Sequence, residues 1–175
     1  MYETLSREKI YSGRIFDLAH YSIRLPDGNV AQRDVIEHGG AAVIVAVAAD
    51  GRLVMVRQHR IGSNAMTLEL PAGKLDPGED PAKCALRELA EETGYIAAKI
   101  SPLPVLFPIA AYCTEKYYMF LAEDLTLGEP NPDDGEFVET ELYSISDLLD
   151  MIKRGEIIDM KTVAMVLYYA TFRKS

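Results

Sequence analysis

The chain has 175 residues, 49% of them hydrophobic, which predicts a soluble globular protein with a substantial core. Its net charge of −9 disfavours nucleic acid as a partner, because phosphate groups would be repelled over most of the surface. We expect a cytoplasmic protein that does not associate with membranes. No apolar run approaches the roughly 18 residues that span a bilayer, and the polar N-terminus, MYETLSREKIYSG, is unlike a signal peptide.

The first part of the chain predicts an arm of antiparallel strands. The segments FDLAHYSIRL and VAQRDVIEH flank the turn sequence PDGN, a pattern typical of a β-hairpin within residues 15–37. We therefore divide the chain into a strand arm at residues 1–38 and a main domain at residues 39–175.

The main domain begins with three β-rich segments. The runs AAVIVAVAA and RLVMVRQHR are joined by Asp50-Gly51, a strong hairpin signal, so we expect these two strands to pair. The segment MTLELPAGK predicts another strand, which ends at Pro71.

A well-bounded helix follows these strands. Asp80 is a good N-cap, Pro81 suits the first helical position, and Gly94 is the expected left-handed residue at the C-terminal end of AKCALRELAEET. The rest of the chain predicts a strand in KYYMFLAEDL, an acidic loop in EPNPDDGEF, and a strand tip with two amphipathic helices in ELYSISDLLDMIKRGEI and MKTVAMVLYYATF. Strands interleaved with a few helices predict a mixed α/β sandwich around one core.

The predicted helix carries a cluster of like charges. Glu88, Glu91 and Glu92 share one helical face within about one turn, where like charges are mildly unfavourable. Such an oxygen-only cluster suits a hard cation such as Mg²⁺ or Mn²⁺. Taken alone, the same cluster also fits a solvated acidic helix face.

The sequence around the cluster decides between these interpretations. Residues 73–95, GKLDPGEDPAKCALRELAEETGY, match the Nudix box, Gly-x5-Glu-x7-Arg-Glu-U-x-Glu-Glu-x-Gly-U, at every fixed position, and Tyr95 fills the final apolar slot. At ordinary residue frequencies such a match arises by chance on the order of once in 10⁸ windows. SGRIFDLAHYSIRLPDG, MVRQHR, LELPAGK, FLAEDL and DMKTV also resemble the ADP-ribose pyrophosphatase branch of the Nudix hydrolases.

This resemblance implies a fold and an activity. The expected fold is the Nudix fold, an α/β/α arrangement with a mixed β-sheet between helices. The branch hydrolyses ADP-ribose to AMP and ribose 5-phosphate with two or three Mg²⁺ or Mn²⁺ ions. The resemblance also implies a homodimer in which the N-terminal strands reach the partner's site.

The resemblance assigns roles in metal binding. Glu88 and Glu92 match the principal metal ligands, Glu91 matches a supporting ligand and is also a candidate catalytic carboxylate, and the backbone carbonyl of Ala72 matches a further ligand. Arg87 and Glu79 are expected to pair, and in the family this arginine orients the carboxylates that bind metal. A simple surface salt bridge is the alternative for this pair.

Further residues are expected at the substrate. Arg60 matches an arginine that contacts the diphosphate, for which a planar guanidinium is well suited, and Glu115 matches a glutamate near the substrate. Arg33, on the arm, is a weaker candidate. For Glu115 an exposed charge at a strand edge is the alternative, and for Arg33 an ordinary surface arginine.

The catalytic base must be a carboxylate other than those occupied by metal. The acidic loop corresponds to a family segment that closes over the substrate, and we predict Glu136 as the base, with Asp134 as the reserve. A solvated acidic loop remains the alternative.

One departure from the branch leaves the substrate open. Ala110 and Ala111 stand where ADP-ribose hydrolases usually carry Pro-Gly. The alternative substrate is therefore another nucleotide sugar, such as GDP-mannose. A non-catalytic nucleotide-sugar sensor is disfavoured because every box glutamate is present, and hydrolysis of oxidised nucleoside triphosphates is disfavoured by the N-terminal arm.

Overall fold

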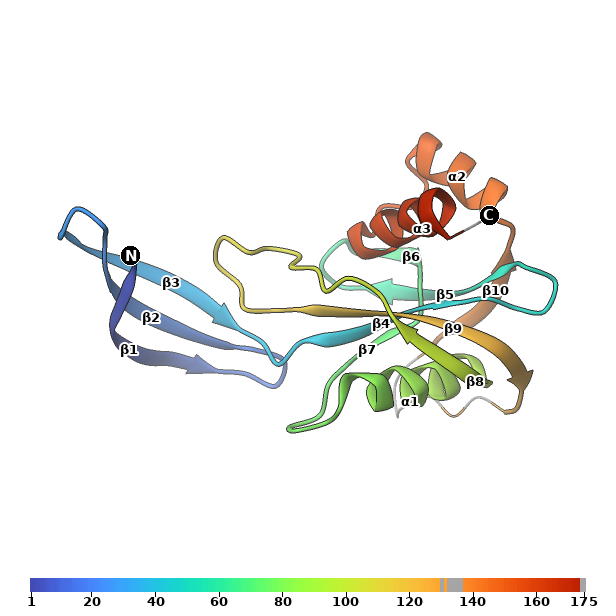
Figure 1. Ribbon diagram of the computed structural model, residues 1–175, viewed down its shortest axis with the longest axis horizontal. Coiled ribbons are helices and arrows are strands. Elements are labelled where there is room, and N and C mark those ends of the chain that lie inside the picture. Colours follow the sequence, from blue (N-terminus) through green and yellow to red (C-terminus); the bar gives the residue numbers. More distant parts are fainter. Residues whose placement is uncertain (130, 132–136, 174–175) are drawn as a thin grey trace.

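The computed structural model describes residues 1–129, 131 and 137–173, and within them the chain forms three β-sheets and three helices (Figure 1). The sheet at the N-terminus projects from the rest of the molecule, and the other two sheets lie between α1 on one side and α2 and α3 on the other. The mixed sheet structure between helices is the predicted Nudix architecture.

The N-terminal sheet has the order β1-β2-β3, with β1 at Glu3–Ser12, β2 at Asp17–Arg24 and β3 at Val30–Glu37. The predicted hairpin is present as β2 and β3, and Gly28, with a φ of 88°, lies in the turn between them. β1 was not predicted as a strand. Every residue of β1 is exposed, so it lacks the alternation of buried and exposed positions that identifies a strand.

The predicted pairing across Asp50-Gly51 is wrong. A tight turn does form there, and Ala48 N donates to Arg52 O at 2.9 Å, but β4 (Ala41–Ala46) and β5 (Leu53–Arg60) enter different sheets. β4 is a fully buried central strand that pairs with β7 and, in parallel, with β9. Because both of its edges are occupied, β4 has no free edge for β5, and a single isolated bridge joins the two segments.

The main domain contains two sheets. One has the order β10-β5-β6, and the other has the order β7-β4-β9-β8. The strand predicted to end at Pro71 is present as β6, and a short strand, β7, follows in the other sheet, so the chain crosses between the sheets at residues 70–71. The strands not yet bounded are β6 (Ala65–Glu69), β7 (Ala72–Lys74), β8 (Tyr95–Pro102), β9 (Tyr117–Leu127) and β10 (Glu139–Tyr143).

Each helix begins after a residue whose side chain caps its N-terminus, and α1 has the bounds that its capping residues predict. In α1 (Pro81–Thr93) the Asp80 side chain accepts from two backbone N–H groups, and Gly94 adopts the left-handed conformation with a φ of 74°. Asp159 caps α3 (Met160–Phe172) in the same way, and Ser144 caps α2 (Ile145–Arg154). No helix in the described part of the chain is long and apolar enough to cross a membrane.

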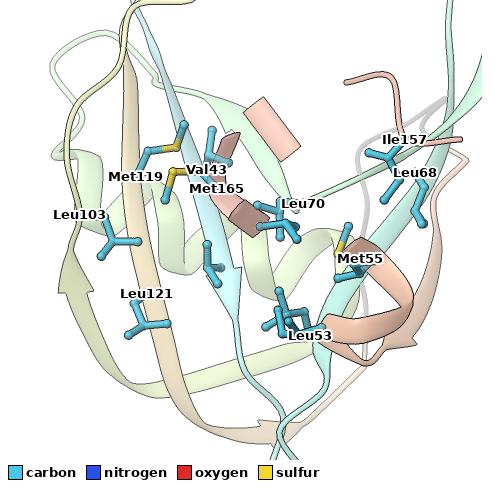
Figure 2. Close-up of a cluster of buried hydrophobic side chains, with 14 residues drawn as sticks. Val43, Leu53, Met55, Leu68, Leu70, Leu103, Met119, Leu121, Ile157 and Met165 are labelled. Atoms are coloured by element: carbon cyan, nitrogen blue, oxygen red, sulfur yellow. The ribbon is translucent and has the colours of Figure 1, made fainter. Parts of the chain in front are cut away.

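The core lies on both faces of β4. Val43 and Val45 point into a cluster with Leu53, Met55 and residues of α2 and α3 (Figure 2). Ala42, Ile44 and Ala46 point the other way, towards Ala85 and Leu89 of α1. Each fully buried aliphatic side chain contributes about 1.5–3 kcal/mol. This double burial explains why β4 is apolar throughout, and it fixes α1 against the sheet.

Candidate active site

The apolar side of α1 determines where its carboxylates lie. Cys84, Ala85 and Leu89 pack against β4, which turns Glu88 and Glu91 towards the segment containing β7. Glu92 is 5% exposed, and its Oε2 accepts a hydrogen bond from the backbone N of Ala72 at 3.1 Å. These carboxylates therefore do not form a solvated helix face.

Arg87 joins the carboxylates of the motif to one another. Its Nε and Nη2 donate to Glu79 at 2.9 and 3.0 Å, and its Nη1 donates to Glu88 at 2.8 Å and to Glu91 at 2.9 Å. The Arg87 hydrogen bonds, followed by the backbone N–H of Asp76, lower the pKa of Glu79 to about 2. In turn, Glu79, Glu88 and Glu91 raise the pKa of Arg87, and the hydrogen bonds to Glu79 contribute most. The arginine thus orients three carboxylates rather than one.

Gly73 is required by the close approach of Glu88 to β7. A Cβ atom built on Gly73 would lie 1.8 Å from Cδ of Glu88, so any other residue would displace this carboxylate. The adjacent residue, Ala72, pairs with Val43 in β4. The central strand therefore fixes the backbone beside the carboxylates.

The donor set fits a hard divalent cation. Glu79, Glu88, Glu91 and Glu92 supply only oxygen atoms, and the guanidinium of Arg87 lies among them, hydrogen-bonded to Glu79, Glu88 and Glu91. Four carboxylates around this one guanidinium are a donor set that suits a hard cation. Within the described ranges, no three Asp, Glu, His or Cys side chains converge as a preformed metal site. The carboxylates are instead held by Arg87 and by the backbone beside the place where an ion would bind.

A cavity of about 1090 Å³ adjoins this cluster. Glu88, Glu91, Glu92 and Ala72 line it, as do Arg60 and Glu115. The volume is at the upper end of that of small-molecule sites. The structure thus brings together at one cavity predicted site residues that are up to 55 positions apart in the sequence (60 to 115).

Arg60 is held by an acidic residue that sequence reasoning missed. Its Nε and Nη2 both donate to Glu69 at 2.8 Å. Glu69 is 1% exposed and also accepts from the Thr67 hydroxyl and from Lys161. Burial by itself would raise the pKa of Glu69, but the hydrogen bonds of Arg60 and the charge of Lys161 lower it to about 2. The available signal was an acidic residue inside an otherwise apolar strand end, LELP.

The other predicted substrate residues have different positions. Glu115 precedes β9 and lies 3.5 Å from Nδ1 of His38. Burial and then the charge of Glu115 raise the pKa of Tyr117, another cavity residue, to about 12. Arg33 is exposed on β3, donates to the carbonyl of Gln32, and is not among the described residues that line the cavity of its own chain.

The predicted base, Glu136, and its reserve, Asp134, lie outside the described residues. Both sides of this segment are fastened to the end of α1, because Asn131 N donates to Glu91 O at 3.0 Å and the Thr140 hydroxyl donates to Glu92 O at 3.3 Å. The described residues Asn131 and Thr140 therefore lie beside the end of α1 that carries Glu91 and Glu92.

Residues 37–164 match the family model of the NUDIX domain. The chain belongs to the Nudix family. It is 36% identical to an ADP-ribose pyrophosphatase of Bacillus subtilis (strain 168), over 95% of this chain and 91% of the relative. It is 35% identical to a methanol dehydrogenase activator of Bacillus methanolicus, with the same coverage, and 32% identical to a GDP-mannose pyrophosphatase of Escherichia coli (strain SMS-3-5 / SECEC), over 96% and 95%.

A solved structure described as an ADP compounds hydrolase superimposes with a TM-score of 0.81, covering 95% of this chain and 90% of that chain. Because its sequence identity is 22%, this match supports the fold alone. The family model and the relatives together identify this Nudix chain as a hydrolase.

Proposed function

We propose that this Nudix hydrolase cleaves the pyrophosphate bond of ADP-ribose, giving AMP and ribose 5-phosphate. The observation that carries the proposal is the group of box carboxylates at the wall of a cavity that Arg60 also lines. An anionic diphosphate needs compensating positive charge to enter such a site, and a cation-binding carboxylate cluster with a nearby arginine can supply it.

In this proposal Glu88, Glu92 and the carbonyl of Ala72 hold two or three Mg²⁺ ions, or Mn²⁺ ions, with Glu91 as a supporting ligand. Such ions, when bound, polarise phosphoryl oxygens and lower the pKa of a water molecule. Arg87 keeps the carboxylates oriented through its hydrogen bonds to Glu88 and Glu91. This ordering reduces the rearrangement that ion binding requires.

The remaining residues act on the substrate and on water. Arg60 binds the diphosphate through its guanidinium, and Glu115 contacts the substrate from the segment before β9. Glu136, with Asp134 as the alternative, removes the proton from the attacking water. The hydrogen bonds of Asn131 and Thr140 to the end of α1 support this role, because these two flanking residues lie beside the turn of helix that carries Glu91 and Glu92.

We further propose a homodimer built through the arm at residues 1–38, separate from the main domain at residues 39–175, with Arg33 reaching the partner's cavity. The sheet projects from the rest of the molecule (Figure 1). The support is its exposed apolar side chains, Ile10, Tyr11 and Val30, together with Tyr2 just before β1. Such a concentration of exposed large side chains is typical of a contact surface. The proposed enzyme acts in the cytoplasm, without nucleic-acid or membrane partners.

A panel of nucleotide sugars tests the substrate. Release of phosphate from the products by alkaline phosphatase is measured with ADP-ribose, GDP-mannose and UDP-glucose, each with Mg²⁺ and with EDTA. We expect Mg²⁺-dependent hydrolysis that is fastest for ADP-ribose. Activity that persists fully in EDTA would contradict the metal requirement.

GDP-mannose is the second candidate substrate. The 32% identity to a GDP-mannose pyrophosphatase over 96% of this chain favours it, as does Ala110-Ala111 at the position of the Pro-Gly marker. A clearly higher kcat/KM for GDP-mannose than for ADP-ribose would select it. Pyrophosphate release from nucleoside triphosphates, measured in parallel, would identify the housecleaning activity instead.

A further inference from the structure

A second charged cluster, distinct from the Nudix box, lies at the same cavity. Its members are Arg60, Glu69, Asp159 and Lys161, all of which line the cavity. Glu69 receives both Arg60 hydrogen bonds and is also paired with Lys161, which lies 3.0 Å from Asp159. The cluster therefore joins β5 and β6 to the first turn of α3.

Lys161 occupies an unfavourable position for a lysine. It lies in the first turn of α3, where the helix dipole disfavours a cation, and its side chain is only 7% exposed. Burying an ammonium group removes its hydration, and this cost can exceed the free energy gained from the ion pair. Neither helix formation nor core packing accounts for a lysine here, so a functional requirement is the better explanation.

The charges of the cluster balance only when Lys161 is present. Arg60 and Lys161 offset Glu69 and Asp159. Without Lys161 the cluster would carry a net negative charge, beside a cavity wall that already holds the excess carboxylates of the box. That added charge would oppose the entry of an anionic diphosphate.

The geometry leaves part of Arg60 available. Glu69 engages Nε and Nη2, and within the described residues no hydrogen bond to Nη1 is formed. The pKa of Arg60 is raised by Glu69 first and also by the charges of Glu92 and Asp159, which places the guanidinium in the field of both carboxylate clusters. A guanidinium fixed along one edge presents its other N–H groups in a constant orientation.

A neighbouring residue, Thr162, attaches the first turn of α3 to the segment just before the Nudix box. Thr162 Oγ1 accepts from Leu70 N at 2.9 Å and donates to Asp159 at 2.6 Å. Leu70 is two residues before Ala72 in the chain. The first turn of α3 thus holds the strand end that carries Glu69.

We infer that Glu69 and Lys161 are positioning residues for the substrate. Glu69 fixes the Arg60 guanidinium in the cavity, and Lys161 neutralises the surplus carboxylate so that Arg60 can bind a diphosphate. This inference rests on the proposed function, because it assigns the orientation of the arginine that contacts the diphosphate.

The experiment compares Lys161→Met with Lys161→Arg and with Lys99→Met, which removes an exposed lysine paired with Glu123 on the β8–β9 edge. Steady-state kinetics with ADP-ribose are measured at saturating Mg²⁺. We expect KM to rise about 10-fold or more in Lys161→Met, because the cluster then carries a net negative charge and Arg60 binds the diphosphate less tightly, while kcat changes less than about threefold. Lys161→Arg is expected to recover part of the affinity, and Lys99→Met to match the wild type.

A charge-balanced variant, Glu69→Gln with Lys161→Met, addresses loss of folding. Removing both partners leaves no buried unpaired charge, so thermal stability is expected to recover. KM is expected to stay raised, because Arg60 has lost its two-point attachment. Recovery of KM together with stability would show that the cluster is purely structural and would overturn the inference.

Binding of ADP in the presence of Mg²⁺, measured by calorimetry, separates this inference from the proposed reaction. If the wild type binds ADP but does not hydrolyse ADP-ribose, the proposed reaction fails while the ADP affinities still test the inference. We expect Kd for ADP to rise with KM in Lys161→Met. A folded Lys161→Met variant with unchanged Kd and KM would overturn the inference.

Discussion

The two charged clusters that line the cavity differ in their balance of carboxylates and cations. Around Arg87, several carboxylates share one guanidinium, and Glu91 has a side chain that is 31% exposed. In the second cluster, the side chain of Glu69 is only 2% exposed, and the cations Arg60 and Lys161 balance Glu69 and Asp159. Unbalanced, accessible oxygen atoms suit a metal ion, whereas balanced, buried charges suit the fixing of a side chain. The difference predicts different kinetic consequences when each cluster is altered.

The largest effect is expected from Glu92→Gln. A carboxamide loses the charge of a proposed metal ligand, and the loss of several kcal/mol of transition-state stabilisation corresponds to a fall in kcat on the order of 10²–10³-fold. Initial rates with ADP-ribose and saturating Mg²⁺ give the measurement, and Glu156→Gln, in an exposed pair with Arg154, is the control. Unchanged hydrolysis would exclude Glu92 as a ligand.

Arg87→Gln is expected to weaken the binding of Mg²⁺ rather than the binding of the substrate. Without the guanidinium, Glu79, Glu88 and Glu91 lose their shared partner and repel one another, so the Mg²⁺ concentration for half-maximal rate should rise about 10–100-fold. Mg²⁺ titration of the rate measures this. Arg57→Gln is the matched control, because Arg57 pairs with Glu141 and is not among the described residues lining the cavity. An equal effect in both variants would contradict the orienting role of Arg87.

Gly73→Ala tests the close approach of Glu88 to β7. The added methyl group would overlap Glu88, so the carboxylate must move, and we expect kcat to fall about tenfold while the protein remains folded. Gly39→Ala is the control, because a Cβ there meets its nearest atom at 3.9 Å. Circular dichroism monitors folding. Wild-type kcat in Gly73→Ala would show that the position of Glu88 is not critical.

The balanced cluster is expected to have a pH-dependent effect on stability, and the smallest effect on the rate at neutral pH. The pKa of Glu69 is lowered from 4.5 to about 2 in the folded state, so its ionised form stabilises the fold above pH 4.5 and this contribution disappears as the pH falls through 2. We expect Glu69→Gln to lower the free energy of unfolding by about 3 kcal/mol at pH 7. Urea unfolding at pH 7, 4 and 3 should show this difference shrinking. A difference that is constant with pH would contradict the lowered pKa.

The sequence alone determined the elements whose signals are local. Asp80, Pro81 and Gly94 bound α1 because capping depends on neighbouring residues only, and the turn at Gly28 specifies the β2–β3 hairpin. The box spacing also placed Glu88, Glu91 and Glu92 near one another, because helical periodicity is enough to do so. The predicted Glu79–Arg87 pair is also present in the structure. It could be predicted because Glu79 lies just before α1 and Arg87 lies within it, so the two are close in the sequence.

Tertiary structure decided what depends on distant partners. β4 and β5 separated despite the turn at Asp50-Gly51, because β7 and β9 occupy both edges of β4 and leave none for β5. Glu69 and Lys161 are separated by 92 positions, so no local sequence pattern predicts their contact. Burial and charge pairing act on residues that meet only after the strands and helices have packed. The metal-binding motif was therefore readable from the sequence, and the cluster that holds Arg60 was not.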